Sequence, residues 1–126
     1  MLVDDNNVNL LALRLLLKKE GEAPVDEAYN GEKALEKVLK RLSRPYCRPY
    51  RLIFMDVNMP VMDGYEATER IREHVGRTTT TIIGASAYPK KEIEARGTEA
   101  GMDDFIGKPL DPADLVTILN RASNLI

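Results

Sequence analysis

The sequence of 126 residues has no long apolar run, only one cysteine and only one histidine. Its longest leucine-rich stretch, Leu10–Leu17, is interrupted by Arg14 and is far shorter than the roughly 20 apolar residues that a bilayer span requires. Because Cys47 stands alone, it cannot form an internal disulfide. No charged-then-apolar signal peptide opens the chain. These absences favour a reducing, cytoplasmic setting without membrane insertion.

The sequence also lacks a surplus of basic residues, since 18 Lys and Arg stand against 20 Asp and Glu. A domain that binds nucleic acid through its general charge usually needs such a surplus, so this function is disfavoured. Hydrophobic residues make up 44% and charged residues 30%, which is typical of a globular protein. We expect residues 1–126 to form a single domain. Because the first apolar run is very short, we also expect this domain to be a segment of a longer polypeptide.

Short apolar runs alternate with helical patterns along the whole chain. The predicted strands are Met1–Val3, Pro24–Ala28, Leu52–Met55, Thr80–Ala87 and Met102–Ile106. The first helix is predicted to start at a cap formed by Asn6 or Asn7 and to run to about Glu20. Asp63 followed by Glu66 is typical of a capping box at the start of another helix. This alternation predicts about five βα units and a mainly parallel sheet with helices on both faces.

Charged residues follow three of the predicted strands. Asp4 and Asp5 come directly after the first strand, Asp56 ends the third, and Lys108 follows the fifth. Because the carboxyl ends of parallel strands meet in the crevice where α/β proteins bind ligands, we expect these four groups to share one pocket.

Such a pocket suits a divalent cation together with an anionic group. Three neighbouring carboxylates repel one another unless a cation offsets the repulsion, and Mg²⁺ prefers oxygen ligands. An aspartate can also act as a nucleophile that carries a phosphoryl group. Lys108 would supply a positive charge for that group, and the hydroxyl of Ser86 can donate to one of its oxygens. The pocket therefore indicates phosphoryl chemistry.

Four segments carry a resemblance to a known family. LVDDN, FMDVNMPVMDGYEA, IIGASA and FIGKP, in this order, resemble the receiver domains of two-component response regulators. The segments FMDVNMPVMDG and GMDDFIGKPL are most similar to receivers of hybrid histidine kinases. The resemblance implies a flavodoxin-like (βα)5 doubly wound parallel sheet with strand order 2-1-3-4-5.

The resemblance also implies a role for each matching residue at the metal. Asp56 would be the phosphoacceptor and a ligand of Mg²⁺, with Mn²⁺ as a possible substitute. Asp5 would bind the metal directly and Asp4 through water, while Asn58 would contribute its backbone carbonyl.

The same resemblance implies a switch. Ser86 and Lys108 would contact the phosphoryl group, the Lys108–Pro109 bond would be cis, and Phe105 would take the position of the switch aromatic residue. Asn58 and Tyr88 would tune the slow autodephosphorylation.

Function follows from these roles as an expectation. The phosphoryl group would come from a phosphohistidine on a histidine kinase or a histidine-containing phosphotransfer domain. Its arrival would change the surface of the fourth helix, fifth strand and fifth helix. The isolated domain would be no conventional enzyme beyond its own phosphorylation, and membership of a hybrid histidine kinase stays open.

Helix one carries two apolar stripes. One stripe, expected to pack on the sheet, consists of Val8, Leu11, Ala12, Leu15 and Leu16. The opposite stripe consists of Leu10, Leu13 and Leu17, and we expect it to be the exposed docking surface for the phosphodonor. Packing of this second stripe against the last helix is the alternative.

Several other residues have a plain interpretation beside a functional one. Asp63 is expected to be a helix cap, and Asp103 and Asp104 are expected in the turn into the fifth strand. His74 lies at a helix end, where a positive charge suits the dipole, which disfavours a histidine-based triad. Cys47 lies between two arginines but is expected to be a bystander. The basic stretch from 37 to 51 is expected to be a solvated face, with docking of an acidic partner as the alternative.

Three rival functions stay open at this point. A nucleotide- or flavin-binding enzyme would share the topology, but its phosphate loop would hardly contain Asp4-Asp5. A constitutive interaction module would not need the acids, the hydroxyl and the lysine. A magnesium phosphohydrolase would turn over small phosphate esters.

Overall fold

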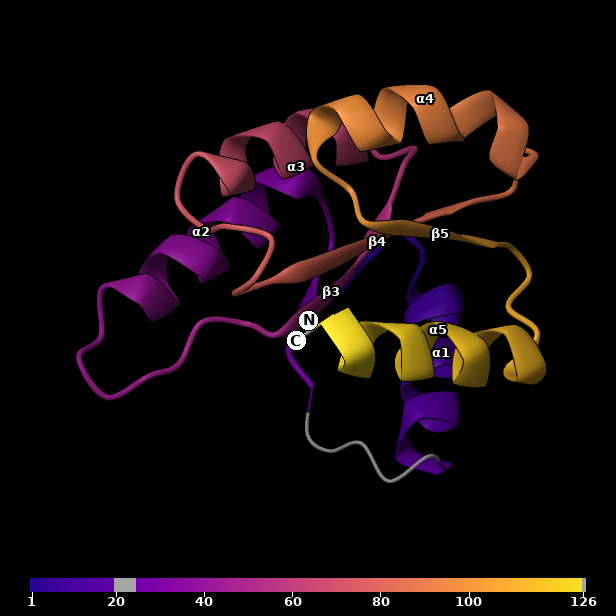
Figure 1. The fold of residues 1–126 in the computed structure, drawn as a ribbon, viewed down its shortest axis with the longest axis horizontal. Coiled ribbons are helices and arrows are strands. Elements are labelled where there is room, and N and C mark those ends of the chain that lie inside the picture. Colours follow the sequence, from indigo (N-terminus) through magenta and orange to yellow (C-terminus); the bar gives the residue numbers. More distant parts are fainter. Residues whose placement is uncertain (20–24, 126) are drawn as a thin grey trace.

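Five parallel strands form one sheet in the order β2-β1-β3-β4-β5, which confirms the predicted topology (Figure 1). The computed structural model describes residues 1–19 and 25–125, with the backbone alone for residues 122–125. The strands are β1 (Leu2–Val3), β2 (Glu27–Ala28), β3 (Leu52–Asp56), β4 (Thr81–Ser86) and β5 (Asp104–Gly107). The expected end of the first helix at Glu20 and the expected start of the second strand at Pro24 lie outside the described residues.

Helices cover both faces of the sheet. They are α1 (Asn7–Lys19), α2 (Gly31–Leu42), α3 (Gly64–Arg72), α4 (Lys90–Ala100) and α5 (Pro112–Leu125). In Figure 1, α2, α3 and α4 lie on one side of the sheet, and α1 and α5 lie on the other. None of the helices in the described part of the chain combines the length and apolar character that crossing a membrane requires.

Alternation along the strands divides the core into two layers. Ile53 and Met55 of β3 point toward α2, α3 and α4, whereas Phe54 between them points toward α1 and α5. Each of these side chains is at most 3% exposed. A continuous apolar run in β3 is therefore required, because both faces of this central strand are covered.

Side-chain caps start three of the helices where the sequence places Asn or Asp. The Oδ1 atom of Asn6 accepts hydrogen bonds from the backbone N–H groups of Val8 and Asn9 ahead of α1, at 2.9 and 3.2 Å. Asn30 caps α2 in the same way. Asp63 caps α3 by accepting from the N–H of Glu66 at 2.9 Å, so its predicted capping role is confirmed.

The fifth strand starts two residues later than predicted. Gly101 ends α4 with a φ of 113°, and the N–H groups of Gly101 and Met102 both donate to the carbonyl of Gly97. This left-handed glycine termination draws Met102 into the helix end. As a result, β5 begins at Asp104 instead of Met102.

The prediction for the two stripes of α1 is wrong. The expected docking residues Leu10, Leu13 and Leu17 are buried, at 3, 8 and 3% exposure, and pack with Leu2, Phe54, Leu115 and Ile118 between the sheet and α5. Most of the stripe expected to face the sheet is exposed instead, with Val8, Leu11 and Leu15 at 73, 47 and 57%, while Leu16 packs at the edge of the same core. The reason is geometric: leucines lie on both sides of α1, so the direction in which the chain leaves β1 decides which side meets the sheet. The alternative of internal packing against α5 is the correct one.

Candidate functional site

The register of the sheet brings the predicted acids together. Val3 pairs with Met55, so Asp4 and Asp56 both lie at the carboxyl ends of adjacent strands β1 and β3. Carboxylate oxygens of Asp4, Asp5 and Asp56 lie within 4.8 Å of one another. Asp4 and Asp56 are buried, whereas Asp5 is exposed, so the group opens to solvent on the side of Asp5.

Lys108 completes the cluster from the far strand β5. Its Nζ lies 2.7 Å from Oδ2 of Asp4 and 2.9 Å from Oδ1 of Asp56. The Lys108–Pro109 bond is cis, as expected, and the backbone N–H of Lys108 donates to the carbonyl of Ser86 at 2.9 Å. The ammonium is therefore fixed between two of the three carboxylates.

Burial dominates the electrostatics of the central acid. It raises the pKa of the Asp56 carboxyl to about 6, against the hydrogen bond and positive charge of Lys108, which act to lower it, and with the negative charge of Asp4, which adds to the rise. At neutral pH Asp56 is mostly ionised but more basic than an ordinary aspartate. Asp56 therefore offers a nucleophilic oxygen, and an additional cation nearby would stabilise its ionised form.

Lys108 responds in the opposite sense. Burial alone would lower the pKa of its ammonium, but hydrogen bonds and charges from Asp4 and Asp56 outweigh burial and raise it. Lys108 thus stays positively charged. It balances only one of the three negative charges in the cluster.

Two neighbours that sequence analysis missed hold Asp4 in place. The backbone N–H of Asn6 donates to Oδ1 of Asp4 at 2.9 Å, and Nδ2 of Asn9 donates to its Oδ2 at 3.3 Å. The sequence predicted Asn6 as a helix cap but did not predict its contact with Asp4. The contact of Asn9 with Asp4 depends on the first turn of α1 and has no sequence signal of its own.

The donor set fits a hard divalent cation. All three side chains offer carboxylate oxygens, and their negative charge exceeds the positive charge of Lys108. Asn58, the further expected ligand, lies two residues beyond Asp56, and its N–H approaches Oδ1 of Asp56 at 3.4 Å. The acidic cluster can therefore hold a metal ion.

Ser86, expected to contact the phosphoryl group, ends the strand next to Asp56. It is 1% exposed, and β4 pairs with β3 so that Asp56 lies opposite Ala85. The Oγ atom of Ser86 accepts a hydrogen bond from the N–H of Tyr88 at 3.0 Å. The Tyr88 side chain is 56% exposed and lines a cavity of about 250 Å³ together with Phe105.

Phe105 occupies an inward position that two glycines make possible. Its side chain is 8% exposed and lies against Gly84 of β4 and Gly97 of α4. A Cβ atom added at position 97 would lie 2.3 Å from Cε1 of the Phe105 ring. Gly97 therefore leaves room for the Phe105 ring against α4. A movement of this ring would change how α4 packs on the sheet.

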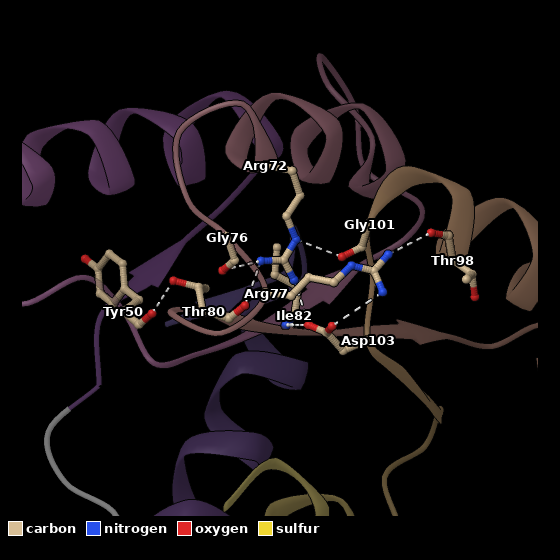
Figure 2. Close-up of polar contacts among 9 residues, drawn as sticks. All are labelled: Tyr50, Arg72, Gly76, Arg77, Thr80, Ile82, Thr98, Gly101 and Asp103. Carbon is tan, nitrogen blue, oxygen red and sulfur yellow. Dashed lines mark hydrogen bonds and ion pairs between the residues drawn. The ribbon is translucent and has the colours of Figure 1, made fainter. Parts of the chain in front are cut away.

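A second charged cluster, which the sequence analysis did not predict, lies at the amino ends of β4 and β5 (Figure 2). Nη2 of Arg72 lies 2.6 Å from Oδ2 of Asp103, and the same oxygen accepts from the N–H of Ile82 at 2.8 Å. Arg72 also donates to the carbonyls of Gly101 and Thr80 at 2.8 and 2.7 Å. Because these contacts engage Asp103 and most of the guanidinium, the cluster is structural: it ties the end of α3 to β4 and to the turn before β5.

The remaining sequence candidates lie outside the acidic site. Asp104 opens β5 and pairs with Arg121 at 3.1 Å. His74 is exposed just after α3. Cys47 is exposed in the loop between α2 and β3. None of the three contacts the acids or Lys108.

Comparisons with known proteins point to one family. Residues 1–120 match the response regulator receiver domain. The two-component response regulator ORR41 of Oryza sativa subsp. japonica is 43% identical over 122 residues, covering 96% of this chain and 91% of that protein. The osmosensing histidine protein kinase SLN1 of Saccharomyces cerevisiae is 34% identical over 121 residues, but the chain spans only 10% of its length.

Solved structures agree with this match. A putative response regulator from Chloroflexus aurantiacus superposes with a TM-score of 0.81 at 31% identity, covering 96% of this chain and 93% of that one. The chemotaxis protein CheY4 of Vibrio cholerae superposes with a TM-score of 0.80 at 29% identity, covering 96 and 94%. With the sheet order and the matched family in agreement, the chain belongs to the response regulator receiver domains of two-component phosphorelay signalling.

Proposed function

We propose that Asp56 accepts a phosphoryl group from a phosphohistidine on a histidine kinase or a histidine-containing phosphotransfer domain. One observation carries the proposal: the Asp56 carboxylate is buried at the end of the central strand, between Lys108 at 2.9 Å and the carboxylates of Asp4 and Asp5. An oxygen of Asp56 attacks phosphorus, the bond from phosphorus to the histidine nitrogen breaks, and that nitrogen keeps the bonding electrons. The raised pKa of Asp56 makes its oxygen a better nucleophile than an ordinary carboxylate.

The proposed cofactor is Mg²⁺, with Mn²⁺ able to replace it. Asp5, Asp56 and the backbone carbonyl of Asn58 would hold the ion directly, and Asp4 would hold it through water. When bound, the ion neutralises charge on the carboxylates and on the phosphoryl oxygens. The excess of negative charge over Lys108 and the all-oxygen donor set support this assignment.

Lys108 and Ser86 would receive the new group. Lys108 carries the only ammonium in contact with Asp56 among the described residues, so it can turn from the carboxylate to a phosphoryl oxygen. The Ser86 hydroxyl already accepts from Tyr88, so its own proton is free to be donated to the phosphoryl group.

The switch would pass from Ser86 to Phe105 and to the α4-β5-α5 surface. Tyr88, Phe105 and Ile118 line the cavity of about 250 Å³ at this surface, so a shift of β4 toward the phosphoryl group would change its shape. Moving a two-state switch from 1:99 to 99:1 requires about 5.5 kcal/mol of differential stabilisation. Charge-assisted hydrogen bonds from Lys108 and Ser86, together with the metal, are of the right size. Asn58 and Tyr88 would tune the later hydrolysis.

The docking surface for the phosphodonor would be the exposed stripe of α1. Val8, Leu11 and Leu15 form an apolar strip on the helix that follows the acidic residues Asp4 and Asp5. A partner domain that presents its phosphohistidine to Asp56 would cover this helix. The strip therefore replaces Leu10, Leu13 and Leu17 as the proposed contact.

The test is incubation with acetyl phosphate and Mg²⁺, followed by intact-mass spectrometry. We expect a mass gain of one phosphoryl group in the presence of Mg²⁺, no gain in EDTA, and no gain in the Asp56→Asn variant. Asp63→Asn is the matched control, since Asp63 is an acid of the same segment that caps α3 and should leave the gain intact. An equal gain in wild type and Asp56→Asn would refute the proposal.

A further inference from the structure

Positive charge is concentrated in one segment of an otherwise acidic chain. The segment from Lys37 to Arg51 contains six of the 18 Lys and Arg and no Asp or Glu. The remaining 12 basic residues therefore stand against all 20 acidic residues. The receiver chemistry does not explain this segregation, since Lys108, which lies outside the segment, is the cation that pairs with the acidic site among the described residues.

The fold bends this segment around a cavity. The last turns of α2 and the loop that follows enclose about 230 Å³, with Lys37, Lys40, Arg41 and Arg44 among the lining residues. This loop leads into the amino end of β3, whereas Asp56 ends the same strand. The basic cavity and the acidic site therefore lie toward opposite ends of β3.

The guanidinium group of Arg41 is fixed in place before any ligand binds. Nε of Arg41 donates to the carbonyl of Arg48 at 2.5 Å, and the guanidinium lies over the Tyr50 ring at 4.3 Å from its centroid. Nη1 of Arg41 lies 3.5 Å from Oδ2 of Asp26, which also accepts from the hydroxyl of Tyr50 at 2.5 Å. A guanidinium that is fixed before binding loses little conformational entropy when a ligand arrives.

Among the described residues, the other cations of the cavity have no ion-pair partner. In the part of the chain that the structure describes, no carboxylate lies within ion-pair distance of Lys37, Lys40 or Arg44. Lys37 donates to the backbone carbonyl of Glu27, which keeps its charge at the cavity without cancelling it. Asp26, the acid among the described residues that line the cavity, is already engaged by Tyr50 and Arg41.

We infer that this basic cavity binds a small, multiply charged phosphate compound, either a free polyphosphate or a phosphate ester. A volume of about 230 Å³ suits one or two phosphate groups. Arginine forks match phosphate oxygens in pairs, and lysines add point charges around them. The inference is independent of phosphoryl transfer to Asp56, because the two sites share no residue.

The test uses inorganic pyrophosphate as the probe, without Mg²⁺, and follows backbone amide signals by NMR. We expect saturable shifts confined to residues 37–51, in wild type and in Asp56→Asn alike. The double variant Lys40→Glu/Arg44→Glu should weaken binding about tenfold or more, since two charge-assisted contacts are lost. Lys18→Glu/Lys19→Glu, on exposed positions of α1, makes the same change in net charge and should leave the affinity within about twofold.

Cys47 offers a second readout, because it is the only cysteine and it lines the cavity. Saturating pyrophosphate should slow its alkylation by neutral iodoacetamide severalfold in wild type, and should have little effect in Lys40→Glu/Arg44→Glu. Shifts that do not saturate, or equal weakening in both double variants, would reduce the cavity to a solvated basic face and overturn the inference. Binding of an acidic peptide without binding of pyrophosphate would overturn it in favour of a protein partner.

Discussion

Replacing Asp56 by asparagine should stabilise the metal-free protein, although it removes the proposed phosphoacceptor. Burial raises the pKa of the Asp56 carboxyl from 3.8 to about 6, so the folded state disfavours its ionised form. A raised folded pKa means that this carboxyl contributes stability when it is protonated, below its unfolded pKa, and that the contribution is lost as pH rises through about 6. Asparagine has nearly the same shape and carries no charge to bury.

The expected size follows from the shift. A difference of about two pKa units corresponds to at most about 3 kcal/mol at pH 7.5, where both folded and unfolded carboxyls are ionised, and water on the open side of Asp5 screens part of it. At pH 5 the advantage of Asp56→Asn should fall to about half of its value at pH 7.5, because the folded carboxyl is then mostly protonated. Urea denaturation in EDTA at both pH values measures the two differences.

Magnesium supplies the control for this prediction. A cation bound by the carboxylates stabilises the wild type by about 2.7 kcal/mol at one hundred times its dissociation constant, and should stabilise Asp56→Asn much less. The gap between the two proteins should therefore close when Mg²⁺ replaces EDTA. An Asp56→Asn variant that is less stable than wild type in EDTA at pH 7.5 would refute the reasoning, since the ion pair with Lys108 would then outweigh the burial of charge.

Three further predictions concern packing and docking. Gly97→Ala places a Cβ against the Phe105 ring, so we expect the free energy of unfolding to fall by about 1–3 kcal/mol in urea denaturation. The NMR signals of the Phe105 ring should also shift. Unchanged ring signals would contradict the packing described. Asp103→Ala leaves the mostly buried Arg72 without its carboxylate and should cost about 3 kcal/mol of unfolding free energy. Asp104→Ala leaves behind Arg121, whose side chain is 57% exposed and can be hydrated, and should cost less than about 1 kcal/mol. The exposed double variant Leu11→Glu/Leu15→Glu should slow phosphorylation by a histidine phosphodonor at least tenfold and leave phosphorylation by acetyl phosphate unchanged. The buried control Leu13→Ala should instead lower the free energy of unfolding by about 2–5 kcal/mol. Equal slowing with both phosphodonors would count against docking on α1.

The sequence was most informative where function and topology meet. Acids or a lysine at the ends of apolar runs are enough to predict the cluster of Asp4, Asp5, Asp56 and Lys108, because parallel strands align their carboxyl ends. The cap at Asp63 was equally predictable, since it depends on contacts within four residues.

The orientation of α1 could not be obtained from hydrophobicity alone, because leucines occupy both of its sides. A finer signal exists: Arg14 lies three residues after Leu11, and Lys18 three residues after Leu15, so these charges share a face with the exposed leucines. Weighing polar neighbours as well as apolar ones would have favoured the correct side.

Contacts between distant segments outside the acidic site could not be predicted from the sequence. The pair Arg72–Asp103 joins residues that are 31 positions apart in the sequence. Two adjacent aspartates before a strand are as typical of a solvent-exposed turn as of a buried ion pair, so the sequence does not distinguish the two. The basic segment was visible in the sequence, but its concave shape depends on how the loop after α2 returns toward β3. In both cases the tertiary fold decides which charges meet.

The proposed function requires that Asp56 itself carries the phosphoryl group. After incubation with acetyl phosphate and Mg²⁺, borohydride reduction converts an aspartyl phosphate into homoserine, and peptide mass spectrometry identifies the converted residue. We expect homoserine at position 56 and aspartate retained at positions 4 and 5. Homoserine at position 4 or 5, with position 56 unchanged, would contradict it.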